Sequence, residues 1–281
     1  VDAELAATLL ALMAREGITS AQPERWLGAG GTPTTAEPYS GDVTLSPSQF
    51  ERALACPLRW FLTTIGADGP SNAAASLGTL VHALAEENPH GSAQELTEAL
   101  EARIEELGYN LDTWAGRHAD RRAHTIVDNL ASYMAGVPGQ VEVERSVEAQ
   151  VEGVTIRGRM DRMEHVDEGV RVTDLKTGKS GYSAKTVPDN PQLAAYQMAL
   201  LASGQKVAGA RIALLGDKKP QSFDQRPLEG ETLEGWREKV REVAAIARGP
   251  YFQATPSDKA CMYCSFDRLC PARERGRKVV E

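Results

Sequence analysis

The chain has 281 residues, of which 42% are hydrophobic, enough for one large core or for one core with an appendage. Its formal charge of −8 excludes a protein that holds nucleic acid by bulk electrostatic attraction alone. No run approaches the roughly 18 apolar residues of a membrane span, and the N-terminal segment lacks the pattern of a secretory signal, so we expect a cytoplasmic protein.

The N-terminal part is predicted to stand apart from the main fold. Residues 2–16 place Leu and Met on one helical face, whereas residues 22–43 are rich in Gly, Pro and Thr. We therefore expect a helical segment of a preceding domain in residues 1–21, a linker in 22–43 and the folded domain in 44–281. The missing initiator Met suggests a piece of a longer chain.

Helix signals dominate the next stretch. Helices are expected to start at Ser46 and Ser92, each with a capping box, and to cover residues 77–87 and 117–135. A Pro directly after Cys56 predicts a kink or break beside that thiol.

The second half is predicted to build a sheet. Alternating apolar residues predict a β-meander of three strands over residues 141–151, 154–166 and 170–179. A helix from Asn190, strands at 207–215 and 221–228, and a helix at 232–248 follow. This order predicts the α/β class.

The stretch VRVTDLKTGK, residues 170–179, carries the first candidate chemistry. Because side chains alternate along a strand, Asp174 and Lys176 lie on one face. The carboxylate can hold a divalent cation, and the ammonium can contact the water or phosphate beside it. An ordinary ion pair on an exposed strand would explain the same two residues.

The hairpin before this stretch offers a partner carboxylate. A turn centred between Asp167 and Glu168 would place Asp161 opposite Asp174, where two carboxylates repel unless a cation or a proton lies between them. A bulge at Gly169 would shift the register by one and move Asp161 to the other face.

Two arginines share the predicted face of Asp161. Arg157 and Arg159 could form a phosphate-binding surface for DNA, or they could belong to a solvated strand face. The roles of the nearby acids Glu142, Glu144 and Glu148 stay open.

All four cysteines fit one metal site. Cys261, Cys264 and Cys270 have the spacing C-x2-C-x5-C, and Cys56 lies far upstream. In a chain with no secretory signal, this spacing is typical of metal ligands.

Taken together, these motifs resemble the RecB family of nuclease domains within the PD-(D/E)-x-K superfamily. That family has, in order, a His on a helix, an Asp, a D-x-K motif and a Q-x-x-x-Y motif. The matching residues are His82, Asp161, Asp174-Leu175-Lys176, Gln192 and Tyr196. The resemblance covers about residues 45–273 and implies a restriction-endonuclease-like core, a mixed central sheet flanked by helices. Taken alone, a His among aliphatic neighbours is more typical of a hydrogen-bonded core residue than of a ligand.

The resemblance implies a metal site. His82, Asp161, Asp174 and the Leu175 carbonyl would bind Mg²⁺, which takes few protein ligands, or Mn²⁺, which accepts a His ligand.

It also implies catalytic roles in metal-assisted phosphodiester hydrolysis. Lys176 would position or activate the attacking water and stabilise charge on the phosphate. Gln192 and Tyr196, on one helical face, would orient Lys176 or the DNA strand.

The cysteines resemble the iron–sulfur staple of AddB- and AdnAB-type helicase–nucleases. The resemblance favours a 4Fe–4S cluster held by Cys56, Cys261, Cys264 and Cys270, although zinc also takes four thiolates. Either metal would join the first helix of the domain to the C-terminal tail.

The implied function is the nuclease domain of a helicase–nuclease in double-strand-break repair, cutting single-stranded DNA delivered by a motor. Its partners would be a helicase domain upstream in the same chain and a second helicase or nuclease subunit. Two alternatives stay open: an inactive, cluster-stapled DNA-binding or scaffolding module, and a stand-alone exonuclease.

Overall fold

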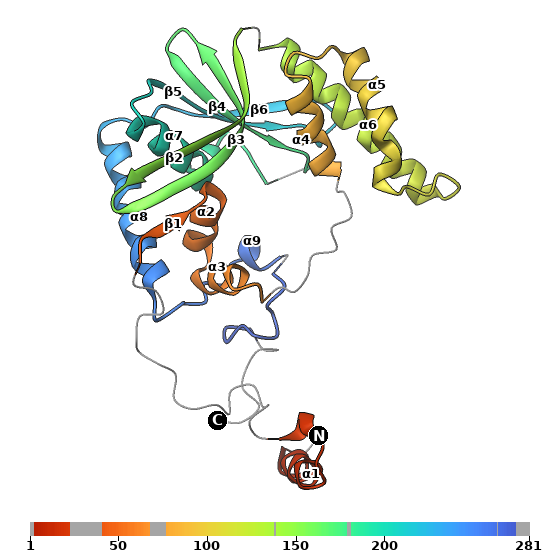
Figure 1. Cartoon of the computed structure of the whole chain (residues 1–281), viewed down its shortest axis with the longest axis vertical. Coiled ribbons are helices and arrows are strands. Elements are labelled where there is room, and N and C mark those ends of the chain that lie inside the picture. Colours follow the sequence, from red (N-terminus) through yellow and green to blue (C-terminus); the bar gives the residue numbers. More distant parts are fainter. Residues whose placement is uncertain are drawn as a thin grey trace.

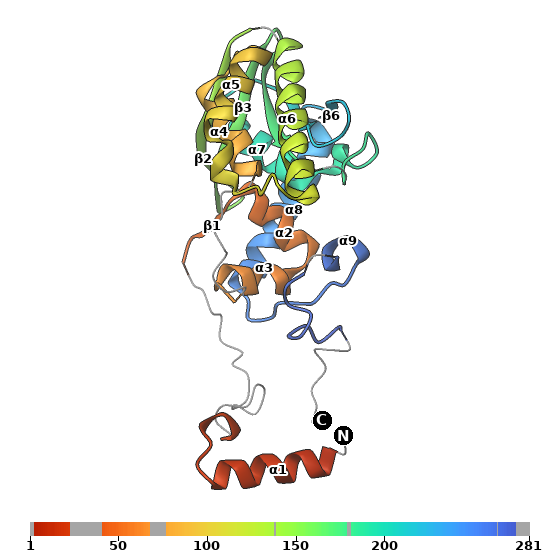
Figure 2. The same ribbon diagram turned by 90° about the vertical axis from the view of Figure 1, so that its right-hand side faces the viewer.

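The computed structural model describes residues 3–22, 41–67, 77–137, 139–178, 181–262 and 264–273. The N-terminal helix α1 (Ala3–Arg15) and the short turn η1 (Thr19–Ala21) lie apart from the other elements in Figures 1 and 2. The predicted helix over residues 2–16 is thus confirmed, while most of the predicted linker lies outside the described residues. The division into domains stays a prediction. No helix within these ranges is long and apolar enough to cross a membrane.

Within the residues that the structure describes, a mixed sheet of six strands forms the centre of the fold. Its strands are β1 (Val43–Leu45), β2 (Val141–Val151), β3 (Val154–Val166), β4 (Gly169–Lys176), β5 (Val207–Leu214) and β6 (Gln221–Gln225). The order is β1-β3-β4-β5-β6, and β2 also pairs with β3. The β1–β3 and β4–β5 pairs are parallel and the others antiparallel. The meander β2–β3–β4 is confirmed.

Helices cover both faces of this sheet (Figure 1). They are α2 (Pro47–Ala55), α3 (Pro57–Thr64), α4 (Leu77–Glu87), α5 (Ala93–Arg103), α6 (Trp114–Ala135), α7 (Pro191–Ala202), α8 (Gly230–Arg248) and α9 (Asp258–Cys261), with short turns η3 (Ile104–Leu107) and η4 (Val187–Asp189). One core lies between the sheet and α2, α7 and α8, and a second between the sheet and α4, α5 and α6. The predicted α/β fold with a mixed central sheet flanked by helices is confirmed.

Local signals in the sequence account for most helix boundaries. The Ser46 hydroxyl accepts a hydrogen bond from Gln49 N at 3.2 Å and completes the predicted capping box. The chain breaks between α2 and α3 at Cys56. Helix α6 begins before the predicted residue 117, because Thr113 caps it by accepting from Gly116 N at 3.0 Å.

The β3–β4 hairpin has the predicted register. The recorded pairs run from Val166–Gly169 to Arg162–Thr173, so the turn centres between Asp167 and Glu168. Gly169 has φ 140° but causes no shift in this pair, and the predicted alternative is wrong. A Cβ at Gly169 would lie 2.2 Å from the Lys206 carbonyl, so close backbone approach requires the glycine. The irregularity falls instead between β4 and β5, after Val170.

Candidate active site

Three polar side chains interlock at the C-terminal end of β4. Lys176 Nζ lies 2.7 Å from Asp174 Oδ2 and donates to Gln192 Oε1 at 3.3 Å. Gln192 Nε2 donates in turn to Asp174 Oδ1 at 2.8 Å. Gln192 lies in the first turn of α7, whose start is fixed by Asn190, which accepts from Leu193 N at 2.8 Å. The predicted pair on one face of β4 therefore exists as an ion pair between a buried aspartate and a half-buried lysine, held by a glutamine.

Asp174 keeps acceptor capacity that its neighbours do not use. The residue is only 5% exposed, and its Oδ2 has the lysine as an ionic neighbour but no well-directed hydrogen bond. Burial raises the pKa of Asp174 to about 6, against the opposing effect of Lys176 and with a further contribution from Asp161. A carboxylate with a free buried lone pair and a raised pKa is suited to a cation.

Lys176 is a cation at neutral pH. Burial by itself would lower the pKa of Lys176, but the nearby Asp174, Tyr182 and Asp161 outweigh burial and raise it. The ammonium is therefore suited to stabilise negative charge and not to remove a proton from water.

A second polar group lies beside the first. His82 on α4, Glu144 on β2 and Asp161 on β3 each offer one ligand atom, and these atoms all lie within 4.8 Å of one another. His82 Nδ1 is 3.3 Å from Asp161 Oδ1. The hydrogen bond to Asp161 raises the pKa of His82, although burial opposes it. Burial also raises the pKa of Glu144, against the effect of Arg159 and with that of Asp161. The mutual repulsion of these acids favours a bound cation.

Glu144 is the functional candidate that the sequence did not single out. It has φ 49°, a left-handed conformation that costs a non-glycine residue roughly 1–2 kcal/mol. The ladder of β2 and β3 records Val143–Arg162 and Arg145–Met160 but skips Glu144, which therefore lies across from Asp161. One signal was present in the sequence. The apolar alternation of this strand is broken by Arg145, directly after Glu144.

The hairpin strands separate at the site. Asp161 and Asp174 follow the last recorded pair, Arg162–Thr173, as the confirmed register requires. Beyond it, Leu175 N donates to Asp161 Oδ2 at 2.7 Å in place of a ladder hydrogen bond. The separation leaves the two carboxylates at the open end of β3 and β4.

A comparison with protein families fits this geometry. The family model described as the PD-(D/E)XK nuclease superfamily matches residues 44–271. The chain belongs to this superfamily.

Individual relatives of this PD-(D/E)XK protein are distant. The Gene 69 protein of Mycobacterium phage D29 is 26% identical over 267 residues, with 80% of this chain and 96% of the phage protein covered. The crystal structure of SSO0001 has 16% identity and a TM-score of 0.43, with 96% and 97% of the two chains covered. A candidate exonuclease from Eubacterium rectale has 13% identity and a TM-score of 0.44, with 83% and 99% covered.

Members of this superfamily typically use a divalent metal ion, and the side chains at this site show whether one would fit. One imidazole and several carboxylates form a donor set suited to Mn²⁺ or Mg²⁺. His82, Glu144 and Asp161 lie close enough together to share one ion, and Asp174 has a free lone pair nearby. Leu175, predicted to bind through its carbonyl, has its N–H bound to Asp161 and its side chain buried against the α6 side of the sheet. The residues present fit the metal.

The remaining predicted residues lie around this centre. Tyr196 OH donates to the Arg159 carbonyl at 2.7 Å, so Tyr196 holds the backbone of β3, whereas Gln192 holds Lys176. Arg157 pairs with Glu148 at 2.7 Å, and Arg159 pairs with Glu86 at 3.0 Å and with Glu144. Both arginines are exposed but neutralised by acids, so their DNA-binding role stays a prediction.

The structure brings the cysteine segments together. Helix α3, which starts directly after Cys56, lies beside the α9 segment in both views (Figures 1 and 2). Arg59 Nη1 donates to the Ala260 carbonyl at 2.8 Å, and the rings of Phe61 and Phe252 stack at 4.0 Å. All four cysteines are free and half-buried.

Proposed function

We propose that this chain is a divalent-metal-dependent deoxyribonuclease that hydrolyses phosphodiester bonds in single-stranded DNA. The observation that carries the proposal is the convergence of Asp174, Lys176 and Gln192 with the His82–Glu144–Asp161 group at the open end of β3 and β4. This arrangement combines a cation site with a fixed ammonium, which are the two elements that phosphodiester hydrolysis needs.

Each residue has a distinct task in this proposal. His82, Glu144 and Asp161 hold the metal, with Asp174 as a further ligand. When bound, the metal polarises the phosphate and lowers the pKa of a water molecule. Lys176 stabilises the charge that develops on the phosphate oxygens, and Gln192 keeps the ammonium in place through its 3.3 Å hydrogen bond.

Degradation of labelled single-stranded DNA in Mg²⁺ or Mn²⁺ tests the activity. We expect the wild-type chain to degrade the strand and Asp174→Ala to leave it intact, because Asp174 joins the metal site to Lys176. Asp167→Ala is the matched control, since Asp167 is exposed in the turn of the same hairpin.

Two other outcomes would contradict the proposal. Equal activity in all three proteins would indicate a contaminating nuclease and contradict the site. A wild-type chain that binds DNA without cutting it would favour an inactive scaffolding module.

We further propose that the chain is the RecB-type nuclease domain of a helicase–nuclease that acts in double-strand-break repair. Support comes from the order of its motifs, His82 to Tyr196, and from its net charge of −8. An acidic domain attracts DNA only weakly, so a motor that delivers the strand would remove the need for strong DNA binding by the domain itself. The gene region upstream tests this, because absence of helicase motifs there would favour a stand-alone exonuclease.

We also propose that Cys56, Cys261, Cys264 and Cys270 hold a 4Fe–4S cluster. The spacing of the thiols supports this, as does the packing of α3 on the tail that carries three of them. Closing so long a loop would restrict the unfolded chain and stabilise the fold.

Cys56→Ser tests the cluster. Anaerobically purified wild type should contain roughly four iron atoms per chain, and the variant should lose them. The Tm of the variant should fall by roughly 5–10 °C, because a stabilisation of a few kcal/mol is lost. Met262→Leu, an exposed change between two of the cysteines, should keep both iron and Tm. One zinc atom per chain in place of iron would show that the four cysteines bind zinc and not a 4Fe–4S cluster. Wild-type protein without either metal would contradict a metal site at the cysteines.

A further inference from the structure

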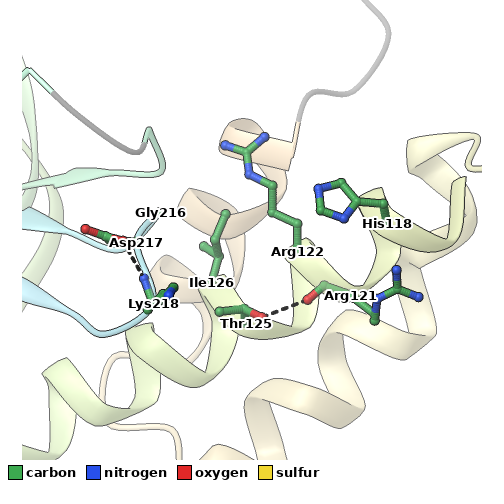
Figure 3. A pocket seen from close by; sticks show the side chains of 8 residues that line it. All are labelled: His118, Arg121, Arg122, Thr125, Ile126, Gly216, Asp217 and Lys218. Carbon is green, nitrogen blue, oxygen red and sulfur yellow. Dashed lines mark hydrogen bonds between the residues drawn. The ribbon is translucent and has the colours of Figure 1, made fainter. Parts of the chain in front are cut away.

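A basic cavity lies next to the candidate active site. It has a volume of about 380 Å³, within the roughly 300–1,000 Å³ range of ligand pockets. Figure 3 shows its two walls, one formed by α6 and the other by the loop after β5. The lining residues are His118, Arg121, Arg122, Thr125, Ile126, Gly216, Asp217 and Lys218.

The charge of this α6 pocket is not neutralised by its own residues. Arg121, Arg122 and Lys218 form no ion pair within the described ranges, and Arg122 Nε is buried without a hydrogen-bond partner. The one acid, Asp217, accepts hydrogen bonds from Lys218 N at 2.7 Å and Gln221 Nε2 at 2.9 Å. The α6 pocket therefore offers positive charge to an anion, unlike the strand face whose arginines are paired with glutamates.

An aromatic platform adjoins the pocket. The rings of Trp114 and His118 stack at 5.3 Å and 2°. Trp114 is 71% exposed, whereas Trp60 and Trp236 are buried. Exposed aromatic rings beside a basic groove are typical of surfaces on which the bases of a single strand stack.

The pocket adjoins the C-terminal end of β4, the strand that carries Asp174 and Lys176. Arg122 Nη2 donates to the carbonyl of Thr177, the residue after Lys176, at 3.2 Å. The loop wall is fixed in the same place, because Leu215 N donates to the Lys176 carbonyl at 2.8 Å. A Cβ at Gly216 would lie 2.2 Å from the Gly178 carbonyl, so the loop and the D-x-K-T-G segment are in close contact.

We propose that the α6 pocket binds the backbone phosphates of a single DNA strand next to the cleaved bond, while Trp114 stacks on one of its bases. This inference rests on the proposed nuclease function and assigns a substrate subsite to it. Arg121, Arg122 and Lys218 supply the positive charge for this contact. Arg157 and Arg159 do not, because glutamates already neutralise them.

Binding of a long, labelled oligothymidylate in EDTA tests the subsite without requiring hydrolysis. The double variant Arg121→Gln with Lys218→Gln should weaken binding severalfold and reduce the salt dependence by about 1.4 in log–log slope, roughly 0.7 for each phosphate contact. Trp114→Ala should weaken binding roughly tenfold, Trp114→Phe should restore most of it, and DNA should quench wild-type tryptophan fluorescence.

A matched control removes the same charge elsewhere. Lys206 and Arg226 are exposed and lie at the opposite end of β5 from the pocket. Lys206→Gln with Arg226→Gln should therefore bind the strand as wild type does.

Each other outcome decides against one part of the inference. Equal binding by the pocket and control variants would overturn the subsite, whatever the activity. A loss confined to 5′-phosphorylated strands would replace backbone binding by an end-phosphate site, and an equal loss for duplex DNA would overturn the single-strand assignment. A chain that binds through the pocket but never cleaves would refute the nuclease proposal and leave the subsite intact.

Discussion

Replacing Lys176 with Gln is expected to lower kcat for single-stranded DNA by about 10²–10³-fold, the usual cost of losing one electrostatic contact to a transition state. The raised pKa of Lys176, which its acidic neighbours maintain against burial, keeps the ammonium charged at neutral pH. Because the charge on the phosphate grows along the reaction, a fixed cation stabilises the transition state more than the bound substrate. KM should therefore change much less than kcat.

Gln is the informative substitution because it can still donate to Gln192. Gln removes the charge beside Asp174 but keeps a polar donor in the side chain, whereas a shorter apolar residue would leave the buried Asp174 Oδ2 with no polar group in place of the ammonium 2.7 Å away. Lys206→Gln, at the far end of β5, controls for loss of a positive charge. If Lys176→Gln kept the wild-type kcat while its circular dichroism was unchanged, Lys176 would not act on the reacting phosphate.

Much of the fold follows from local sequence. Capping residues such as Ser46 and Thr113 fix helix starts because their side chains satisfy backbone N–H groups within one turn. The β3–β4 register was predictable only as one of two, because a two-residue turn of Asp167 and Glu168 and a bulge at Gly169 both fit the sequence, and the observed pairs are those of the two-residue turn. That register brings Asp161 and Asp174 to the same end of the hairpin.

The parts that were not predictable depend on contacts between distant segments. Glu144 joins the site because its backbone leaves the strand conformation; the break in alternation at Arg145 marks an irregularity there, but it does not say which side chain turns towards Asp161. The pairing of Arg159 with Glu86 links β3 to α4, and the α6 pocket depends on the packing of α6 against the loop after β5. Spacing along the chain predicted the candidate D-x-K motif, but which charged side chains are paired with acids depends on tertiary structure.

Mn²⁺ is expected to raise the Tm of the wild-type chain by roughly 5–10 °C when present at about 100 times its Kd. Such binding adds about 2.7 kcal/mol of stability, and a chain of this size gains about 2–4 °C per kcal/mol. The stabilisation arises because the ion relieves repulsion among Glu144, Asp161 and Asp174 in the folded state.

The pH dependence of this shift has a definite sign. The pKa of Asp174 is raised from 3.8 to about 6 in the folded chain, so its proton stabilises the metal-free fold at low pH, and that contribution is lost as pH rises through about 6. The pKa of His82 is raised as well, so its proton also stabilises the folded chain at low pH, and this contribution is lost as the pH rises through the pKa of His82 in the folded chain. Since Mn²⁺ must displace these protons, the metal-induced shift should be small near about pH 5 and should grow towards about pH 8.

Asp161→Asn isolates the site's contribution to this shift. Asn keeps the size of the side chain and can still accept the hydrogen bond from Leu175 N, but it removes a charged donor from the metal group. We expect the variant to lose most of the Mn²⁺-induced rise in Tm, and Asp167→Asn, in the turn of the same hairpin, to retain it. If the shift were equal at both pH values and in both variants, Mn²⁺ would be bound by groups other than the carboxylates and the imidazole at the end of β4.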